Sequence, residues 1–167
     1  YTTLALWVGC IFLLALMKIT PSTEGLKDPR PYQLFFGRFG ILFLLGQLQW
    51  IVIYIGNIYV LKTQCLHPGR MFLTGAVTSF TFMLLCYAVT LAFADLGKAI
   101  IVVIVVLQIA GSSGTYPIEV LPEFFQKVYV FFPFPYAINA MRECMFGYYE
   151  NDYIIYMLQL LAFAAAA

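Results

Sequence analysis

The side chains that most often carry catalysis or bind metals are few in this sequence and widely spaced. It contains a single histidine, His67, whose one nearby candidate partner is Cys65. An imidazole with no carboxylate beside it is more typical of a loop residue than of a general base or a metal ligand. No HExxH, GxSxG or nucleotide-binding lysine motif occurs. The sequence therefore predicts that this protein is not an enzyme, uses no cofactor or metal, and does not hydrolyse ATP by itself.

The four cysteines are scattered and form no metal-binding spacing. Cys10 and Cys86 fall within apolar segments, where cysteine behaves as a small hydrophobic residue. Cys65 and Cys144 fall in connections that are expected on the same side of the membrane, the outer one. A disulfide between these two is one interpretation, and two free thiols are the other.

Uncharged polar residues recur inside the apolar segments at helical spacing. They are Gln47, Trp50, Tyr54 and Asn57 in one segment, Thr74, Thr78 and Thr81 in the next, and Gln108 in a third. Steps of three and four residues place each set on one face of a helix. Such a face either bonds neighbouring helices, at roughly 0.6 kcal/mol per contact, or lines a translocation path or a subunit seam. No charge lies in the middle of a segment, which argues against a carrier coupled to protons or sodium.

The composition identifies the environment that must position these residues. Hydrophobic residues make up 63% of the 167, charged residues 10%, and the mean hydropathy is +0.90. A water-soluble domain carries about 25% charged residues, so this surface faces lipid or the chain is a buried piece of a larger assembly. The net charge of +1 without any basic run excludes a typical nucleic-acid-binding domain.

The apolar runs predict an all-α integral membrane domain over residues 1–167. A helix that crosses the hydrocarbon core needs about 20 mostly apolar residues. We expect five such helices, at about 3–19, 39–61, 71–94, 98–116 and 152–167. The β-branched run at 100–107 could instead be a buried strand, but the amphipathic helices that would cover a parallel sheet are missing.

Residues 20–38 are predicted to form the cytosolic connection between the first two spans. Placing the first and third connections inside gives five Lys or Arg residues inside and four outside, which puts Tyr1 outside and Ala167 in the cytoplasm. The DPRP element is stiff, because each proline restrains the residue before it. This connection is either a plain interfacial elbow or the surface that contacts a cytosolic motor. The residues expected to make that contact are Asp28, Pro29, Arg30, Pro31 and Arg38.

Residues 117–150 are too apolar for a solvated loop and too rich in proline for a plain span. We expect a re-entrant helical hairpin on the outer side, entering over 118–132, turning at 133–135 and returning over 136–147. Irregular backbone at that depth needs protein around it, so the hairpin should pack on the other spans or on a second subunit. Glu119 and Glu123 share a helical face and are expected to contact Arg142 or Lys127. The hairpin residues are Gly114, Pro117, Glu119, Pro122, Glu123, Pro133, Pro135 and Arg142.

Residues 114–143, GTYPIEVLPEFFQKVYVFFPFPYAINAMRE, resemble the C-terminal signature of the YhgE/Pip (phage infection protein) family of ABC-2-type membrane proteins. LWVG at 6–9 is similar to the start of that family's membrane domain. The resemblance implies a six-span domain with a cytosolic coupling helix and a re-entrant hairpin, of which this chain is the C-terminal part. It also implies an upstream span and a large extracellular domain.

Two functions remain open from the sequence. The first is a membrane-embedded export or translocation subunit of the bacterial plasma membrane, acting as a homodimer or within a membrane complex, with a cytosolic ATPase or secretion-system components as partners. The second is a membrane anchor and dimerisation platform for an extracellular domain, as in phage adsorption or as a type VII secretion accessory protein, without transport of its own. An intramembrane enzyme would need a catalytic pair facing one cavity, and the sequence supplies none.

Overall fold

In the computed structural model, residues 1–17, 30–112, 114, 118–147 and 151–167 are described, and all regular structure in them is helical. The helices are α1 (Thr2–Leu16), α2 (Pro31–Ile55), α3 (Pro68–Phe93), α4 (Asp95–Gly111), α5 (Glu123–Val128), α6 (Pro133–Phe146) and α7 (Asp152–Ala166). Short π and 3-10 turns span Gly56–Val60, Ile118–Val120 and Tyr129–Phe131. This confirms the all-α prediction for the described residues, and residues 100–107 lie in α4 rather than in a strand.

Two of the described helical segments have the length and apolar composition to cross a bilayer. They are Tyr32–Val60, which joins α2 to the π turn, and Pro68–Phe93, which is α3. Helices α1 and α7 are apolar but shorter. The number of five spans therefore stays a prediction.

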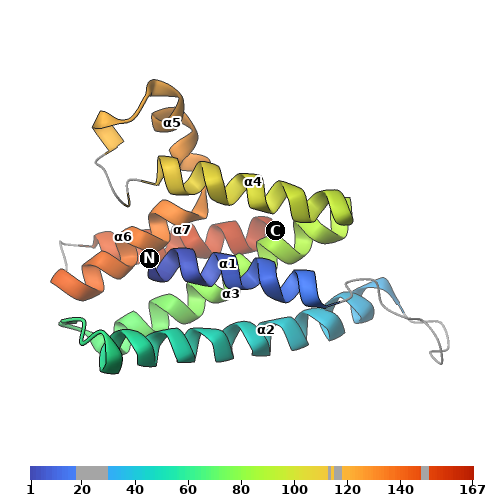
Figure 1. The fold of residues 1–167 in the computed structure, drawn as a ribbon, viewed down its shortest axis with the longest axis horizontal. Helices are drawn as coiled ribbons and strands as arrows, with labels where there is room; N and C mark the ends of the chain where they lie inside the picture. Colours follow the sequence, from blue (N-terminus) through green and yellow to red (C-terminus); the bar gives the residue numbers. More distant parts are fainter. Residues whose placement is uncertain (18–29, 113, 115–117, 148–150) are drawn as a thin grey trace.

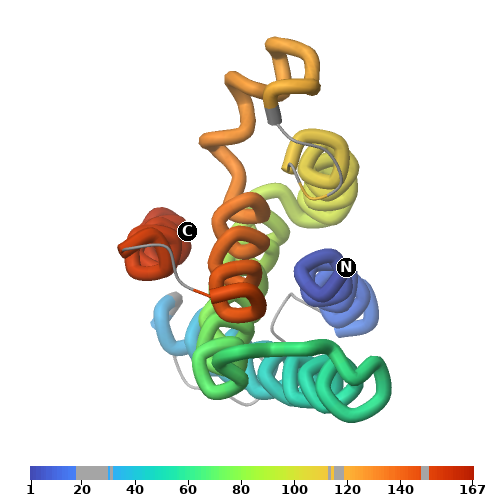
Figure 2. Tube along the Cα trace, turned by 90° about the vertical axis from the view of Figure 1, so that its left-hand side faces the viewer, coloured from blue at the N-terminus to red at the C-terminus, as the bar shows by residue number. Residues whose placement is uncertain are grey.

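Helix α3 is the centre of the bundle. It packs against α1, α2, α4, α6 and α7, and these helices surround it when the molecule is viewed along its length (Figure 2). Small buried residues such as Gly75 and Ser79 let its neighbours approach closely. The rings of Trp7 on α1 and Phe134 on α6 both pack on Phe82 of α3, with centroids 4.8 and 5.9 Å away. One aromatic cluster thus joins three helices that are remote in sequence.

A single residue separates α3 from α4. Ala94 joins them with φ 51° and ψ −125°, a conformation that favours glycine because it has no Cβ. Asp95–Gly97, which separate the spans expected at 71–94 and 98–116, belong to the first turn of α4, where Lys98 Nζ lies 3.0 Å from Asp95 Oδ1. A Cβ at Gly97 would meet the carbonyl oxygen of Val89 at 2.5 Å, so the close crossing of α3 and α4 requires glycine there.

Helix α2 begins earlier than the span expected at 39–61. Its first residue is Pro31, whose missing N–H costs nothing at the first helical position. The side-chain amide oxygen of Gln33 accepts a hydrogen bond from the Arg30 backbone N–H at 3.3 Å and caps this end. Residues 31–38 therefore belong to α2 and not to a loop. Of the rest of the expected coupling loop, Arg30 is described and residues 20–29 lie outside the described residues.

The two limbs of the expected hairpin touch near the turn, where Tyr136 OH donates to the Val130 carbonyl at 3.0 Å and Asn139 Nδ2 donates to Tyr129 OH at 3.3 Å. Beyond the turn they pack on different helices. Helix α5 packs on the end of α4, where Phe125 lies over Gly111, whereas α6 packs on α3 and α7. Figure 1 shows α5 standing away from the bundle. The turn lies at Phe132 rather than at 133–135, because Pro133 begins α6. Insertion of this segment into a membrane stays a prediction.

The packing of α2 on α3 predicts opposite effects for two glycines. A Cβ at Gly75 would collide with the Trp50 ring, whereas a Cβ at Gly40 meets nothing within 4 Å. Gly75→Ala should lower stability by about 1–3 kcal/mol through overpacking. Gly40→Ala should be neutral or slightly stabilising, because alanine favours helix. Melting midpoints in detergent test this, and equal midpoints for the two variants would contradict the packing.

Candidate functional site

The polar face predicted for residues 47–57 is directed at neighbouring helices. Gln47 Nε2 donates to the Ala76 carbonyl at 3.1 Å and Trp50 Nε1 to the Phe72 carbonyl at 2.9 Å, both on α3. Tyr54 OH donates to the Pro68 carbonyl at 3.1 Å. Asn57 Nδ2 donates to Thr2 Oγ1 of α1 at 3.0 Å. All four residues thus bind helix to helix, which is one of the two roles that the sequence leaves open.

Two of the three threonines predicted as a polar face of α3 lie in contacts between helices. Thr78 Oγ1 donates back to the Thr74 carbonyl at 2.8 Å. Thr74 Oγ1 lies 3.1 Å from Tyr153 OH of α7. Thr81 Oγ1 donates to the Val77 carbonyl and is 3.4 Å from the Leu160 carbonyl of α7. The hydroxyls of Thr74 and Thr81 therefore lie between α3 and α7, whereas the Thr78 hydroxyl is bonded within α3.

Gln108 differs from the other predicted polar residues. Its side chain is 1% exposed on the inner face of α4. Neither its amide oxygen nor its amide nitrogen has a hydrogen-bond partner within the described part of the chain. A buried amide without partners costs about 1–3 kcal/mol, so Gln108 lowers the stability of the packing of α4 in the bundle.

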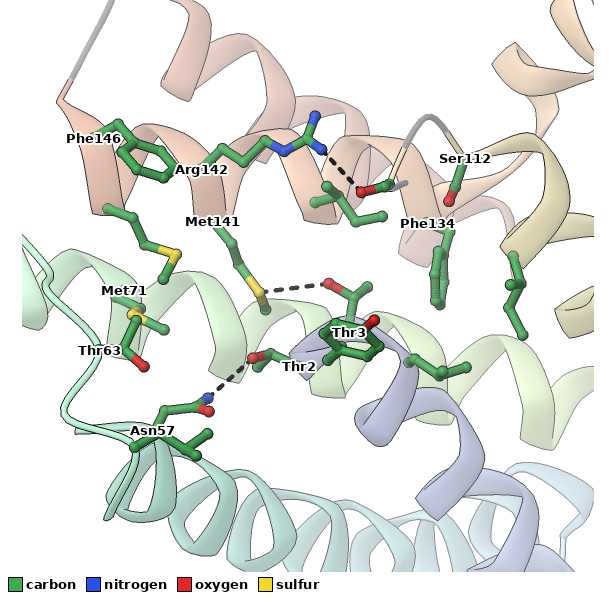
Figure 3. Close-up of a pocket in the computed structure, with 17 residues that line it drawn as sticks. Thr2, Thr3, Asn57, Thr63, Met71, Ser112, Phe134, Met141, Arg142 and Phe146 are labelled. Carbon is green, nitrogen blue, oxygen red and sulfur yellow. Dashed lines mark hydrogen bonds between the residues drawn. The ribbon is translucent and has the colours of Figure 1, made fainter. Parts of the chain in front are cut away.

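A cavity of about 430 Å³ lies at the end of the bundle where α1 and α3 begin and where α2 and α4 end. Figure 3 shows that α6 closes one side and the connection after α2 the other. The lining is mainly apolar, with Met71, Met141, Met145, Phe134, Phe146 and Ile138 among its residues. Polar groups at its edges come from Thr2, Thr3, Asn57, Thr63, Ser112 and Arg142.

Among the described residues that line this cavity, Arg142 is the one basic side chain and none is acidic. Its Nη2 donates to the carbonyl of Gly114 at 3.2 Å, which ties α6 to the segment after α4 (Figure 3). Thr3 Oγ1 contacts the sulfur of Met141 at 3.6 Å. The cavity therefore combines an apolar interior with a cation at its rim, which suits an amphiphilic ligand.

The cavity unites residues from separate sequence predictions. Asn57 comes from the intramembrane polar face, and Gly114 and Arg142 come from the hairpin. Thr2, Thr63 and Ser112 were not predicted, because isolated small polar residues near helix ends carry no periodic signal. Met71, Met141 and Met145 are weak indicators of a binding surface in the sequence, since methionine is common at adaptable binding surfaces.

Other predicted site residues lie apart from the cavity. Glu123 pairs with Lys127 at 3.8 Å on the exposed surface of α5, as expected for one of the two basic partners. The carbonyl of Glu119 lies 3.5 Å from Gln126 Nε2. Pro122 precedes α5, and Pro133 and Pro135 are buried in the first turn of α6. Asp28, Pro29 and Pro117 lie outside the described residues.

The predicted contacts of the coupling loop are described only at its end. Arg30 Nη1 donates to Tyr32 OH at 3.3 Å. Pro31 opens α2, and Arg38 lies two turns further along the same helix. Among the described residues, no three His, Cys, Asp or Glu side chains come together as a metal site would require.

Comparison with known proteins gives the family. Residues 26–167 match the family model described as ABC-2 family transporter protein. The chain is 28% identical over 151 residues to a Bacillus subtilis (strain 168) protein described as "Uncharacterized protein YhgE". That alignment covers 87% of this chain and 19% of the relative, so the chain spans about a fifth of the relative's length. No solved structure matches the chain.

The family match covers both the long apolar helices and the segment 114–143 that resembles the YhgE/Pip signature. The relationship to YhgE supports the same assignment along most of the sequence. The chain therefore belongs to the ABC-2 transporter family.

Proposed function

We propose that this chain is the membrane-embedded export subunit of an ABC-2-type transporter and that its substrate contacts the cavity at the outer end of the bundle. Membership of the family implies a membrane protein of permease type, and ABC-2 membrane domains work with ATPase partners. The match of residues 26–167 to that family carries the proposal. The two helices long enough to cross a bilayer fall within the matched residues.

The outer surface of the bundle supports a lipid environment. Leu44, Leu48 and Val52 form one stripe on α2 and are 67, 58 and 64% exposed. Large exposed apolar residues occur likewise on α4 and α7, among them Val103, Val106, Leu158 and Leu161. Continuous apolar faces of this extent are rare on soluble monomers, and hydrocarbon would cover them without cost.

The topology follows from the predicted orientation. With Tyr1 outside, the starts of α1 and α3 and the ends of α2 and α4 all lie on the outer side, and the cavity lies there with α6. Arg30 and Arg38 then lie at the cytosolic end of α2, where an ATPase would bind. A homodimer would supply the second half of the pathway, as expected from the sequence.

The lining of the cavity suggests the class of substrate. Apolar walls favour a hydrocarbon chain or another apolar group, and Arg142 at the rim favours a negative charge. We therefore expect an anionic amphiphile.

The alternative function, an anchor and dimerisation platform, is favoured by a different observation. The polar side chains of α2 and α3 are used in bonds between helices, which a rigid anchor needs. The extracellular domain expected upstream would then carry the activity, in adsorption of a phage or in assembly of a secretion system.

Labelling of exposed positions tests the orientation. Gln64→Cys in the connection after α2 should react with a membrane-impermeant maleimide in intact cells. Leu96→Cys at the start of α4 should react only after permeabilisation, because it lies at the opposite end of the bundle. Both residues are exposed, and both variants are made in a Cys65→Ser background. The reverse pattern would invert the topology.

Charge reversal tests the coupling surface. Arg30→Glu together with Arg38→Glu in the full-length protein should reduce copurification of the ATPase at least tenfold, since a cationic contact becomes repulsive. Lys62→Glu, at the far end of α2, is the matched control and should retain the partner. An Arg30→Lys and Arg38→Lys variant checks that the helix end tolerates substitution. Undiminished copurification of the reversed variant would remove the coupling assignment.

Filling the cavity separates the two functions. Ile138→Trp adds volume inside the cavity and should abolish complementation of a deletion strain if export passes this site. Leu158→Trp on the exposed face of α7 is the control and should complement fully. Complementation by both variants, at equal protein levels, would favour the anchor.

A further inference from the structure

Two cysteines that are 79 residues apart in sequence meet beside the cavity. Cys65 lies in the connection between the π turn and α3, and Cys144 lies near the end of α6. Cys65 Sγ donates to the carbonyl oxygen of Cys144 at 3.3 Å. The backbone N–H of His67 donates to the same oxygen at 3.2 Å. These bonds fix the connection against the end of α6.

The fixed backbone brings the two sulfur atoms within reach of each other. A cysteine sulfur lies at most about 5 Å from its own carbonyl oxygen by covalent geometry, so the two sulfurs are within about 8 Å. Rotation about each χ1 moves a sulfur by a few ångströms between staggered positions. All four cysteines are free thiols in this structure. A disulfide needs Cβ atoms about 3.5–4.5 Å apart, so its formation requires the connection to move toward α6.

The two thiols differ in access. Cys65 is half-buried at the surface, whereas Cys144 is 0% exposed with its sulfur 3.5 Å from Thr74 Oγ1. Cys10 and Cys86 are buried in the bundle, at 1 and 0% exposure. An oxidant that arrives from solvent therefore meets Cys65 first, and Cys144 is the nearby thiol that can resolve the product.

We propose that Cys65 and Cys144 form an intramolecular disulfide by exchange with a disulfide-bearing oxidant. The Cys65 thiolate attacks one sulfur of the oxidant, and its disulfide breaks to release one thiolate. The Cys144 thiolate then attacks Cys65 Sγ and displaces the second thiolate. The two protein thiols lose two electrons, the oxidant gains them, and the two released thiolates take up the two protons.

The bond would join two walls of the cavity. Leu61 and Thr63 line it from the connection that carries Cys65, and Met141 and Met145 line it from the helix that carries Cys144. Leu66 lies beside the end of α6. Its Cδ1 would be 3.6 Å from a Cβ placed on Gly147, the residue after that helix. Oxidation therefore fixes these walls together, and reduction lets them separate. Oxidised conditions outside the cell favour the bond, given the proposed orientation, but its formation does not depend on transport.

The test uses purified full-length protein in detergent with oxidised glutathione as the probe. After oxidation of the folded protein and then denaturation, maleimide should label two fewer thiols, and unreduced peptide mapping should find Cys65 linked to Cys144. Dithiothreitol should restore both thiols. Cys144→Ser should stop at a glutathione adduct on Cys65, and Cys65→Ser should keep Cys144 reduced. A variant with Cys10→Ala and Cys86→Ala should behave as the wild type does.

Three results would overturn the proposal. They are a glutathione adduct that persists on Cys65 in the wild type, a link that joins either cysteine to another residue or to a second chain, and no loss of either thiol. Because every arm reads only which thiols are oxidised, failure here would leave the export and anchor functions as they stand.

Discussion

The bundle depends on the requirement that polar groups placed in a water-poor interior find partners within the protein. Helix α2 satisfies it by directing its amides, indole and phenol at carbonyls of α3 and at a hydroxyl of α1. Gln49 adds a further bond, from Nε2 to the Ala5 carbonyl of α1 at 3.0 Å. Backbone carbonyls accept these bonds without giving up their helical partners, because each has two lone pairs. The same bonds set the register of α1, α2 and α3.

Much of the fold was predictable because hydrophobic length is a strong signal in a membrane protein. The two longest apolar runs became the two longest helices, α2 and α3. The ends of the helices were harder to predict from hydrophobic length. The beginning of α2 was placed eight residues late, because Arg38 was read as a boundary, whereas a long arginine side chain can extend from a continuing helix. In the proline-rich segment the chain turns at Phe132, and insertion of this segment into the membrane stays a prediction. Hydropathy alone does not show that Phe125 packs α5 on Gly111 of α4.

The candidate site was predictable only in part, for a related physical reason. Periodicity identifies residues on one face of one helix, and it identified the polar residues that became contacts between helices. A cavity is made where several helix ends meet, and its residues share no period. Arg142 and Asn57 could be singled out as polar residues in apolar surroundings, while Thr63 and Ser112 depended on tertiary placement.

Gln108 gives this bundle an uneven energy landscape. Both polar atoms of its amide are sealed from solvent without a partner in the described structure, and α3 passes into α4 through one residue in an unfavourable backbone conformation. A shift of α4 that brought the amide to a polar partner and relaxed Ala94 would relieve both penalties. Both penalties fall on α4, which packs against α1 and α3, and they lower the free energy needed to move α4 against these two helices.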